Sequence, residues 1–421
     1  MNESLLCYIW RHSLAGRSFQ STDGQEIRVE HPGVWNRHAG PDFLNARIRI
    51  GDTLWAGNVE MHLRASDWGR HGHEQDEKYR NVILHVVLSE DEKVFSGLGR
   101  RLPCLDLSEW IPAGIVERYG EWQASADPMP CRPFLHQLNA ASLRPWLGRL
   151  ALERLERRGH ELIRTLDEGP EAWEVCFHTL LFRAFGLPAN GLPFEMLARI
   201  WLRVPGRKKL AAADAEAALL YLSGLLEACA EDPWCREQVE RGRALAPELT
   251  PLQPALWSLL RMRPAAFPSI RIAQLAAVLA ALGPAGHQER LTLEPAHWVR
   301  ILQTQASAYW DDHYRPGQAV LRSYPKIIGP QQRTSLVANA FAPYLSASGL
   351  WHDDHALVRR AVALLERVAP EDNRVVRNWL NLDRTDVSAL ETQGWMELDR
   401  SFCNAGRCLE CRIGYQLLGG G

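Results

Sequence analysis

The sequence lacks any apolar run long enough to cross a bilayer, and Met1 leads into Asn-Glu-Ser rather than into a basic, hydrophobic leader. These absences argue against a membrane span and a signal peptide, and they predict a cytoplasmic location. A large charge imbalance is also missing, because the formal net charge is −2. A strongly basic, nonspecific nucleic-acid binder is therefore disfavoured, although local arginines and a metal ion could still neutralise phosphate. No fixed-period repeat is strong enough to indicate a solenoid.

Cysteines are few, with nine spread unevenly over 421 residues. In a reducing compartment such cysteines are free thiols or metal ligands rather than disulfides. Cys176, Cys229 and Cys235 fall on apparently helical segments, so we expect them to be buried and to behave as small apolar residues.

The cysteines near the end of the chain follow the pattern Cys403-x₄-Cys408-x₂-Cys411. Three thiols in nine residues can surround one tetrahedral metal ion or hold part of an iron–sulfur cluster. The pattern therefore predicts a Zn²⁺ or 4Fe–4S centre. The preferred fourth ligand is Cys131, and the alternatives are Cys104 and Cys7.

Strand-like patterns dominate the first part of the chain. Alternating or continuous apolar residues predict strands at 25–30, 43–50, 53–63, 81–88 and 102–107, after a short amphipathic helix at 5–14 and with a polar segment at 66–78. In the second strand, Leu44, Ala46, Ile48 and Ile50 are expected to share the buried face. The strand at 81–88 is nearly all apolar, which favours a buried central position.

Potential metal ligands are concentrated between residues 31 and 88. Glu60 and His62 alternate with apolar residues, so they are predicted to project from the same face of their strand. Asp42 lies at the start of the preceding strand, where it can direct its carboxylate toward the neighbouring strand. Two carboxylates with a third donor suit Mg²⁺ or Mn²⁺, which keeps water in its remaining positions for attack on a substrate. Glu3 could add a carboxylate, although the helix dipole already explains an acidic residue there.

The pairs Pro41-Asp42 and Glu60-Met61-His62 resemble the signature of the PD-(D/E)XK nuclease superfamily, in which proline–aspartate precedes an acidic-x-lysine triplet. The resemblance implies a small restriction-endonuclease-like sheet and metal binding by Asp42 and Glu60. The superfamily's lysine position falls on His62, where a neutral imidazole would act as a base, as a metal ligand or as neither. His31, and Gln75 with Tyr79, match the RecB-like branch of the superfamily more weakly.

Further donors lie just beyond the predicted hairpin. They are His71, His73, Asp76 and His85. Imidazole combined with carboxylate also suits Zn²⁺, Mn²⁺ or Fe²⁺. His71 or His73 is expected to assist at the metal or at the leaving group, and Asp76 and His31 are additional candidate ligands.

Over nearly its whole length the chain is also similar to an uncharacterised bacterial family, domain of unknown function 2851. The resembling segments include 31–33, 39–43, 55–60, 66–68, His71-x-His73 with Asp76 and Tyr79, 81–87, Arg263-Pro264 and 408–411. This resemblance implies no activity.

From about residue 140 the pattern changes to amphipathic helices separated by proline and glycine. Helices are predicted at 143–166, 172–185, 194–202, 212–230, 271–282, 295–308, 333–345, 355–369 and 374–380. The fold class is therefore α+β, with a mixed α/β domain at 1–128, a larger all-α domain at 129–400 and a cysteine-rich tail at 401–421. Two basic spots, 203–209 and 261–264, are either solvated helix ends or phosphate contacts.

The leading functional hypothesis is a metal-dependent nuclease or phosphodiesterase, with Asp42, Glu60, His62, His71 and His73 as the catalytic set and nucleic acid as the partner. One alternative is a non-catalytic scaffold with a degenerate nuclease-like core. Another is a zinc-dependent hydrolase of unknown substrate. The sequence indicates no oligomeric state.

Overall fold

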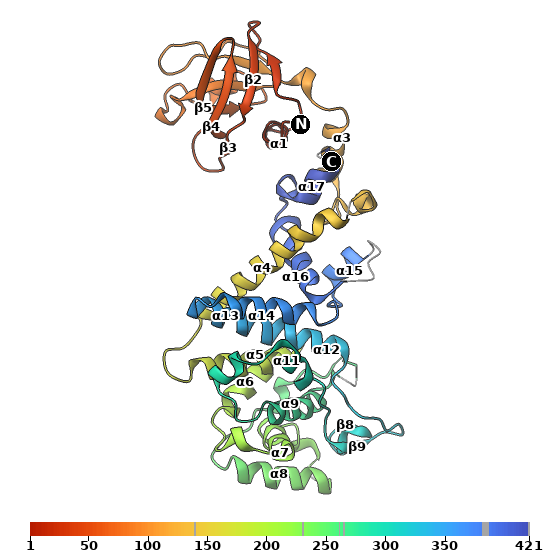
Figure 1. The fold of residues 1–421 in the computed structure, drawn as a ribbon. Coiled ribbons are helices and arrows are strands. Elements are labelled where there is room, and N and C mark those ends of the chain that lie inside the picture. Colours follow the sequence, from red (N-terminus) through yellow and green to blue (C-terminus); the bar gives the residue numbers. More distant parts are fainter. Residues whose placement is uncertain (139, 230, 261, 264–265, 381–386, 420–421) are drawn as a thin grey trace. The chain divides into compact units, whose positions relative to one another are not determined.

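The computed structural model describes residues 1–421 except 139, 230, 261, 264–265, 381–386 and 420–421. It comprises two compact units, one of Met1–Leu143 with Arg400–Gly421 and the other of Arg144–Asp399. A seven-stranded sheet lies in the N-terminal unit, and helices make up most of the other unit (Figure 1). The predicted α+β class is therefore confirmed.

The sheet of the N-terminal unit has the strand order β1-β2-β4-β5-β6-β7, and β3 pairs with β4. The pairs from β1 to β5 are antiparallel, whereas β6 runs parallel to both β5 and β7. The strands are β1 (Ser18–Gln20), β2 (Glu26–His31), β3 (Val34–Trp35), β4 (Phe43–Ile50), β5 (Thr53–Met61), β6 (Val82–Val87) and β7 (Cys104–Asp106). β6 is buried along its whole length, as its apolar sequence predicted.

Helix α1 (Glu3–Arg11) covers one face of this sheet (Figure 1). It begins at Asn2, whose side chain accepts a hydrogen bond from the backbone of the first turn. Its apolar side packs into one core with Val59 and Met61 of β5. Because side chains alternate along a strand, Glu60 and His62 point to the opposite face.

A register shift in β4 corrects the predicted pattern of that strand. The expectation that Leu44 shares the buried face with Ala46 is wrong, because Phe43 takes that place and is fully buried. The pairing with β5 shifts between Phe43 and Ala46, and Asn45 has a positive φ of 57°. An extra residue at this bulge reverses the alternation before it. The side chain of Asn58 accepts a hydrogen bond from the Asn45 backbone at 3.2 Å.

The second unit packs its helices around a large apolar core. The helices are α4 (Ala140–Arg164), α5 (Ala172–Gly186), α6 (Gly191–Trp201), α7 (Ala212–Leu222), α8 (Pro233–Leu245), α9 (Pro268–Leu282), α10 (His287–Leu291), α11 (Pro295–Ile301), α12 (Pro330–Leu336), α13 (Ala342–His352), α14 (His355–Glu366), α15 (Arg374–Leu380) and α16 (Ala389–Leu398). The sequence did not predict α8, α10, α16 or the small ribbon of β8 (His313–Arg315) and β9 (Gln318–Ala319).

The predicted helix at 212–230 is interrupted after α7. Gly224 follows with a positive φ of 72°, and a Cβ at this position would lie 2.1 Å from the carbonyl oxygen of Leu252. Glycine therefore ends the helix, because any side chain there would collide with backbone.

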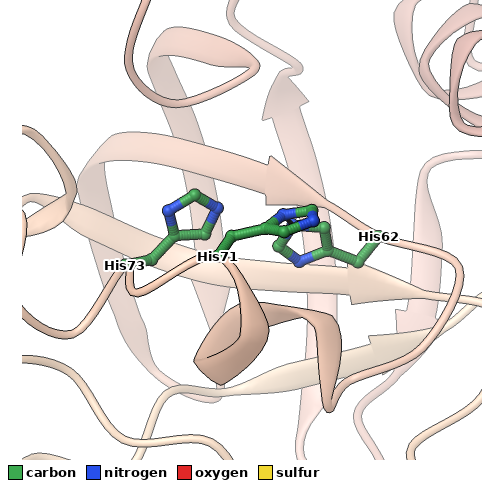
Figure 2. Close-up of side chains that lie close together, drawn as sticks. All are labelled: His62, His71 and His73. Atoms are coloured by element: carbon green, nitrogen blue, oxygen red, sulfur yellow. Dashed lines mark hydrogen bonds between the residues drawn. The ribbon is translucent and has the colours of Figure 1, made fainter.

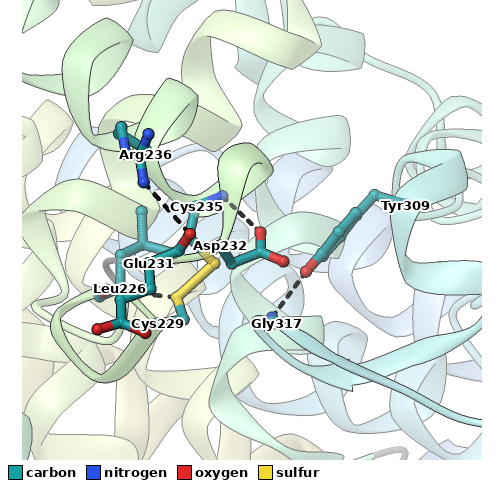
Figure 3. Close-up of a disulfide and its surroundings, with 8 residues drawn as sticks. All are labelled: Leu226, Cys229, Glu231, Asp232, Cys235, Arg236, Tyr309 and Gly317. Atoms are coloured by element: carbon teal, nitrogen blue, oxygen red, sulfur yellow. Dashed lines mark hydrogen bonds between the residues drawn. A yellow bond between two sulfur atoms is a disulfide. The ribbon is translucent and has the colours of Figure 1, made fainter.

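Cys229 and Cys235 form a disulfide, so the expectation that they are buried free thiols is wrong (Figure 3). The chain turns back between them, and the side chain of Asp232 caps α8 by accepting a hydrogen bond from the Cys235 backbone at 2.9 Å. This turn brings the two Cα atoms to 6.0 Å, which is within bonding geometry. Cys176 is a half-buried free thiol.

The C-terminal segment belongs to the N-terminal unit. It contains η10 (Asp399–Cys403), η11 (Cys408–Glu410) and α17 (Arg412–Leu418), and α17 packs against α3 (Ile115–Ala124). Glu410 forms an ion pair with Arg37, and the Leu417 carbonyl accepts a hydrogen bond from Arg118. None of the helices in the described ranges combines the length and apolarity that a bilayer crossing requires.

Candidate metal centre

Predicted donors from two segments meet at the end of β5 (Figure 2). Glu60 and His62 come from the strand end and are 5% and 2% exposed. His71 and His73 come from the connection to β6, just after α2 (Asp67–Arg70). Gly72 between them has a positive φ of 70°, so the backbone turns sharply and both imidazoles approach His62.

The separations of the donor atoms match those of ligands around one ion. His62 Nε2 lies 3.1 Å from His71 Nδ1 and 3.5 Å from Glu60 Oε1. His73 Nε2 lies 3.3 Å from the same carboxylate oxygen. Ligands of a tetrahedral zinc ion at ~2.0–2.1 Å are roughly 3.3 Å from one another. The three imidazoles all have a ligand nitrogen within 4.8 Å of the others, so the set can hold a metal ion.

Aromatic packing holds His73 in this position. Its ring stacks on Tyr79 with a centroid distance of 3.8 Å and meets the edge of Trp68 at 5.3 Å. Its Nε2 is buried and makes no hydrogen bond in the structure. The Glu60 carboxylate oxygen lies 3.3 Å away without completing a hydrogen bond, and a metal ion between the two atoms would satisfy the buried nitrogen.

His85 supports the centre from β6, where it pairs in register with Glu60. Its Nε2 lies 2.9 Å from His62 Nδ1, so it sets the orientation of the His62 ring. Burial, reinforced by the neighbouring imidazoles, lowers the pKa of His62 to about 3 and that of His85 to about 4. Both rings are therefore neutral near pH 7, which is the form that binds metals.

Asp42 lies directly beside Glu60. Its backbone N–H donates to Glu60 Oε2 at 3.0 Å, and its own Oδ2 accepts from the Met61 backbone at 3.1 Å. Burial, with the nearby Glu60 charge, raises the pKa of Asp42 to about 7. These two hydrogen bonds hold the two predicted carboxylates beside each other.

The charges of the centre act on two residues of α1. Burial raises the pKa of Glu3, and His71 and Glu60 are among the groups whose charges act on it. Burial, together with Asp42 and Glu60, raises the pKa of Cys7. The suggestion that Glu3 adds a carboxylate to the site stays a prediction. The alternative role of Cys7 as a fourth ligand for the C-terminal cysteines also stays a prediction.

His31 and Asp76 do not join the group of ligand atoms found among the described residues. His31 is exposed at the end of β2, where its Nδ1 accepts a hydrogen bond from Gly33 at 3.1 Å. Asp76 is also exposed and caps the short helix η1 (Glu77–Tyr79) by accepting from Lys78 at 2.9 Å. Local backbone hydrogen bonds account for both side chains.

The four cysteines of the second predicted metal site all belong to the N-terminal unit. They are Cys131, Cys403, Cys408 and Cys411. Burial raises the pKa of Cys131 to about 12, and Cys411 and Cys408 contribute to this shift, so the three thiols are neighbours. In the described ranges, however, the cysteine sulfurs form no set of three within 4.8 Å. Four thiolates on one tetrahedral zinc are roughly 3.8 Å apart. The sulfurs are therefore more widely spaced than a single zinc ion requires, and the predicted centre stays a prediction.

The fold and the site together define an α+β protein with a candidate histidine-rich metal centre in its sheet-containing unit. Residues 3–374 match the family described as "Protein of unknown function (DUF2851)", and the chain belongs to this family. Neither a curated protein nor a solved structure matches the chain significantly. Of the resembling segments, Pro264 lies outside the described residues.

Proposed function

We propose that the N-terminal unit is a metal-dependent phosphodiesterase that hydrolyses nucleic acid. The observation that carries this proposal is the convergence of three imidazoles and Glu60 Oε1 at the separations of ligands around one ion. Three nitrogen donors favour Zn²⁺, Mn²⁺ or Fe²⁺ over Mg²⁺, which prefers oxygen. The donor chemistry thus favours a transition metal.

The residues of the centre divide into ligands and a proton acceptor. His62, His71, His73 and Glu60 would hold the ion. A divalent ion there would act as a Lewis acid on the phosphate oxygens and the attacking water, and it would supply the charge that lysine supplies in the resembling superfamily. Asp42 uses Oδ2 to accept the Met61 backbone N–H, and its other oxygen is the one we assign to take the proton from water.

Nucleic acid is proposed as the substrate because Pro41-Asp42 and Glu60-Met61-His62 resemble a nuclease signature. The basic spot at 203–209 forms η4 (Arg207–Lys209), where Lys208 already pairs with Glu174 at 3.2 Å. The other basic spot, 261–264, lies partly outside the described residues, so its role as a phosphate contact stays a prediction.

The test combines metal analysis with a cleavage assay on the full-length protein. Purified protein is analysed for bound metal and incubated with single- and double-stranded DNA and RNA in Mn²⁺, Zn²⁺ or Mg²⁺. We expect bound transition metal and cleavage. His73→Asn should lose both, and Asp42→Asn should keep the metal while cleavage falls about 10²–10⁴-fold, the usual contribution of a general base.

His31→Asn is the matched control, because it removes an imidazole of the same unit that lies outside the cluster. It should retain metal and activity. Bound zinc without cleavage of any nucleic acid would instead favour a hydrolase of another substrate. Absence of metal together with absence of cleavage would favour a non-catalytic scaffold.

A further inference from the structure

The helical unit contains a cavity of ≈360 Å³ between α5, α9, α12 and the segment just before α15. Small-molecule sites usually measure ~300–1,000 Å³, so the cavity is large enough for a small ligand. Phe185 and Leu187 provide apolar walls, and Arg271, Gln331 and Ser335 contribute polar atoms. Apolar walls with a few polar groups are typical of ligand sites.

Arg271 is the distinctive residue of this cavity. In the described part of the chain its guanidinium makes one long hydrogen bond, from Nη1 to Gln274 Oε1 at 3.5 Å, and no ion pair. Burial lowers its pKa to about 10, and no acidic neighbour offsets the shift. The side chain thus brings a positive charge and several donors to the cavity wall without forming an ion pair among the described residues.

Other largely buried arginines of the same unit have partners. Arg290 pairs with Glu174 at 2.7 Å, and Nη1 of Arg158 donates to the Ala338 carbonyl at 2.7 Å. A buried charge is unfavourable unless an opposite charge or hydrogen bonds compensate for it. Arg271 therefore lacks the short hydrogen bond or ion pair that the other buried arginines make. A ligand in the adjoining cavity could supply this interaction.

The acidic residues that line the cavity make hydrogen bonds to residues other than Arg271. Asp372 Oδ1 accepts a hydrogen bond from Arg377 Nε at 2.6 Å. Glu371 accepts one from Gln393, and the charge of Arg154 acts on it. These carboxylates still repel additional negative charge, so the cavity favours a ligand with a single anionic group over a polyanion.

We propose that this cavity binds a small organic oxoanion, either a carboxylate or a phosphate monoester, whose oxygens accept hydrogen bonds from Arg271. The planar guanidinium presents paired donors that match two oxygens of such a group. The remainder of the ligand lies against Phe185 and Leu187. This site is independent of the proposed phosphodiesterase centre, and neither proposal depends on the other.

Thermal unfolding of the full-length protein tests the proposal, with inorganic phosphate and acetate as probes and chloride at equal ionic strength as the reference. We expect a saturating rise in Tm with at least one probe. A ligand at about 100 times its Kd raises the folded-to-unfolded ratio about 100-fold. Arg271→Gln should abolish at least nine-tenths of this rise, whereas Arg236→Gln, which removes an exposed arginine of α8, should preserve it.

Ser335→Asp provides a second test that leaves Arg271 in place. The new carboxylate lies in the cavity lining and acts as an internal anion, so the probes should no longer raise Tm. A response to phosphate alone identifies a phosphate ligand, and a response to acetate alone identifies a carboxylate ligand. The proposal is overturned if neither probe raises Tm above the chloride reference, or if Arg271→Gln or Ser335→Asp responds as the wild type does.

Discussion

In the proposed nuclease interpretation, His62 would take the position at which the resembling superfamily has lysine. The imidazole lies among His71, His73 and His85, and burial with these neighbours lowers its pKa to about 3. It therefore carries no positive charge near pH 7 and cannot stabilise phosphate as lysine does. The same neutral ring is a good metal donor, so the substitution fits a centre in which an ion supplies the charge.

His85 is a positioning residue in this scheme, since it touches His62 rather than the donor site itself. We predict that His85→Leu lowers metal affinity about 10–100-fold, the usual effect of losing such a support. His85→Gln can still offer a hydrogen-bonding atom to His62 and should restore most of the affinity. Competition with a chelator measures both variants, and His38→Gln, at an exposed site, is the control. Equal affinity of His85→Leu and wild type would contradict the assignment.

His178 in α5 gives the helical unit a pH-dependent stability. Burial lowers its pKa from 6.5 to about 4, so the folded state binds fewer protons than the unfolded state. The free energy of unfolding is therefore unaffected by His178 protonation above pH 6.5. It falls by up to ~3 kcal/mol as the pH falls toward 4. Urea denaturation at pH 7 and pH 4.5 should show a smaller pH difference for His178→Gln than for wild type. His160→Gln, an exposed site on α4, should behave as wild type.

At the scale of elements, β4 shows what local pattern can and cannot specify. The strand spans Phe43–Ile50, as the alternation predicted. The pattern did not predict the bulge at Asn45, because a bulge depends on pairing with β5 rather than on the strand's own residues. That bulge changes the face occupied by Phe43, next to Asp42.

We predict that Asn45→Val destabilises the N-terminal unit by about 1–2 kcal/mol, because a β-branched residue disfavours a positive φ. Asn45→Gly should be nearly neutral, since glycine accepts this conformation readily. Chemical denaturation of the two variants gives the comparison. Similar stability of the valine and glycine variants would show that the bulge is not maintained by this backbone conformation.

On the scale of the whole molecule, the C-terminal segment completes the unit that begins at the N-terminus. Ile413, Leu417 and Leu418 of α17 are buried. Burying each such side chain stabilises by ~1.5–3 kcal/mol, so the three together contribute several kcal/mol. This is a substantial part of the ~5–15 kcal/mol that stabilises a typical domain.

Deletion of residues 400–421 should therefore destabilise the N-terminal unit strongly. We expect loss of near-ultraviolet circular dichroism and rapid proteolysis within residues 1–143, while deletion of 419–421 alone should have little effect. Retention of protease resistance by the longer deletion would show that the unit is stable without α17.

The sequence by itself determined most of the elements and the residue types of the centre. Apolar periodicity reflects which side of an element is buried, and Asp42, Glu60, His62, His71 and His73 stand out because donors at this density are uncommon. Tertiary structure decided which donors meet. His31 and Asp76 are equally good ligands by type, yet chain direction and local capping place them elsewhere.

Tertiary structure also decided the state of the cysteines and the use of Arg271. The Cys229–Cys235 disulfide depends on a turn, and the unpaired guanidinium depends on elements far apart along the chain. Local pattern reports burial, because burial repeats with the period of a helix or strand. Distances between side chains from different segments depend on how those segments pack, and no local pattern contains them.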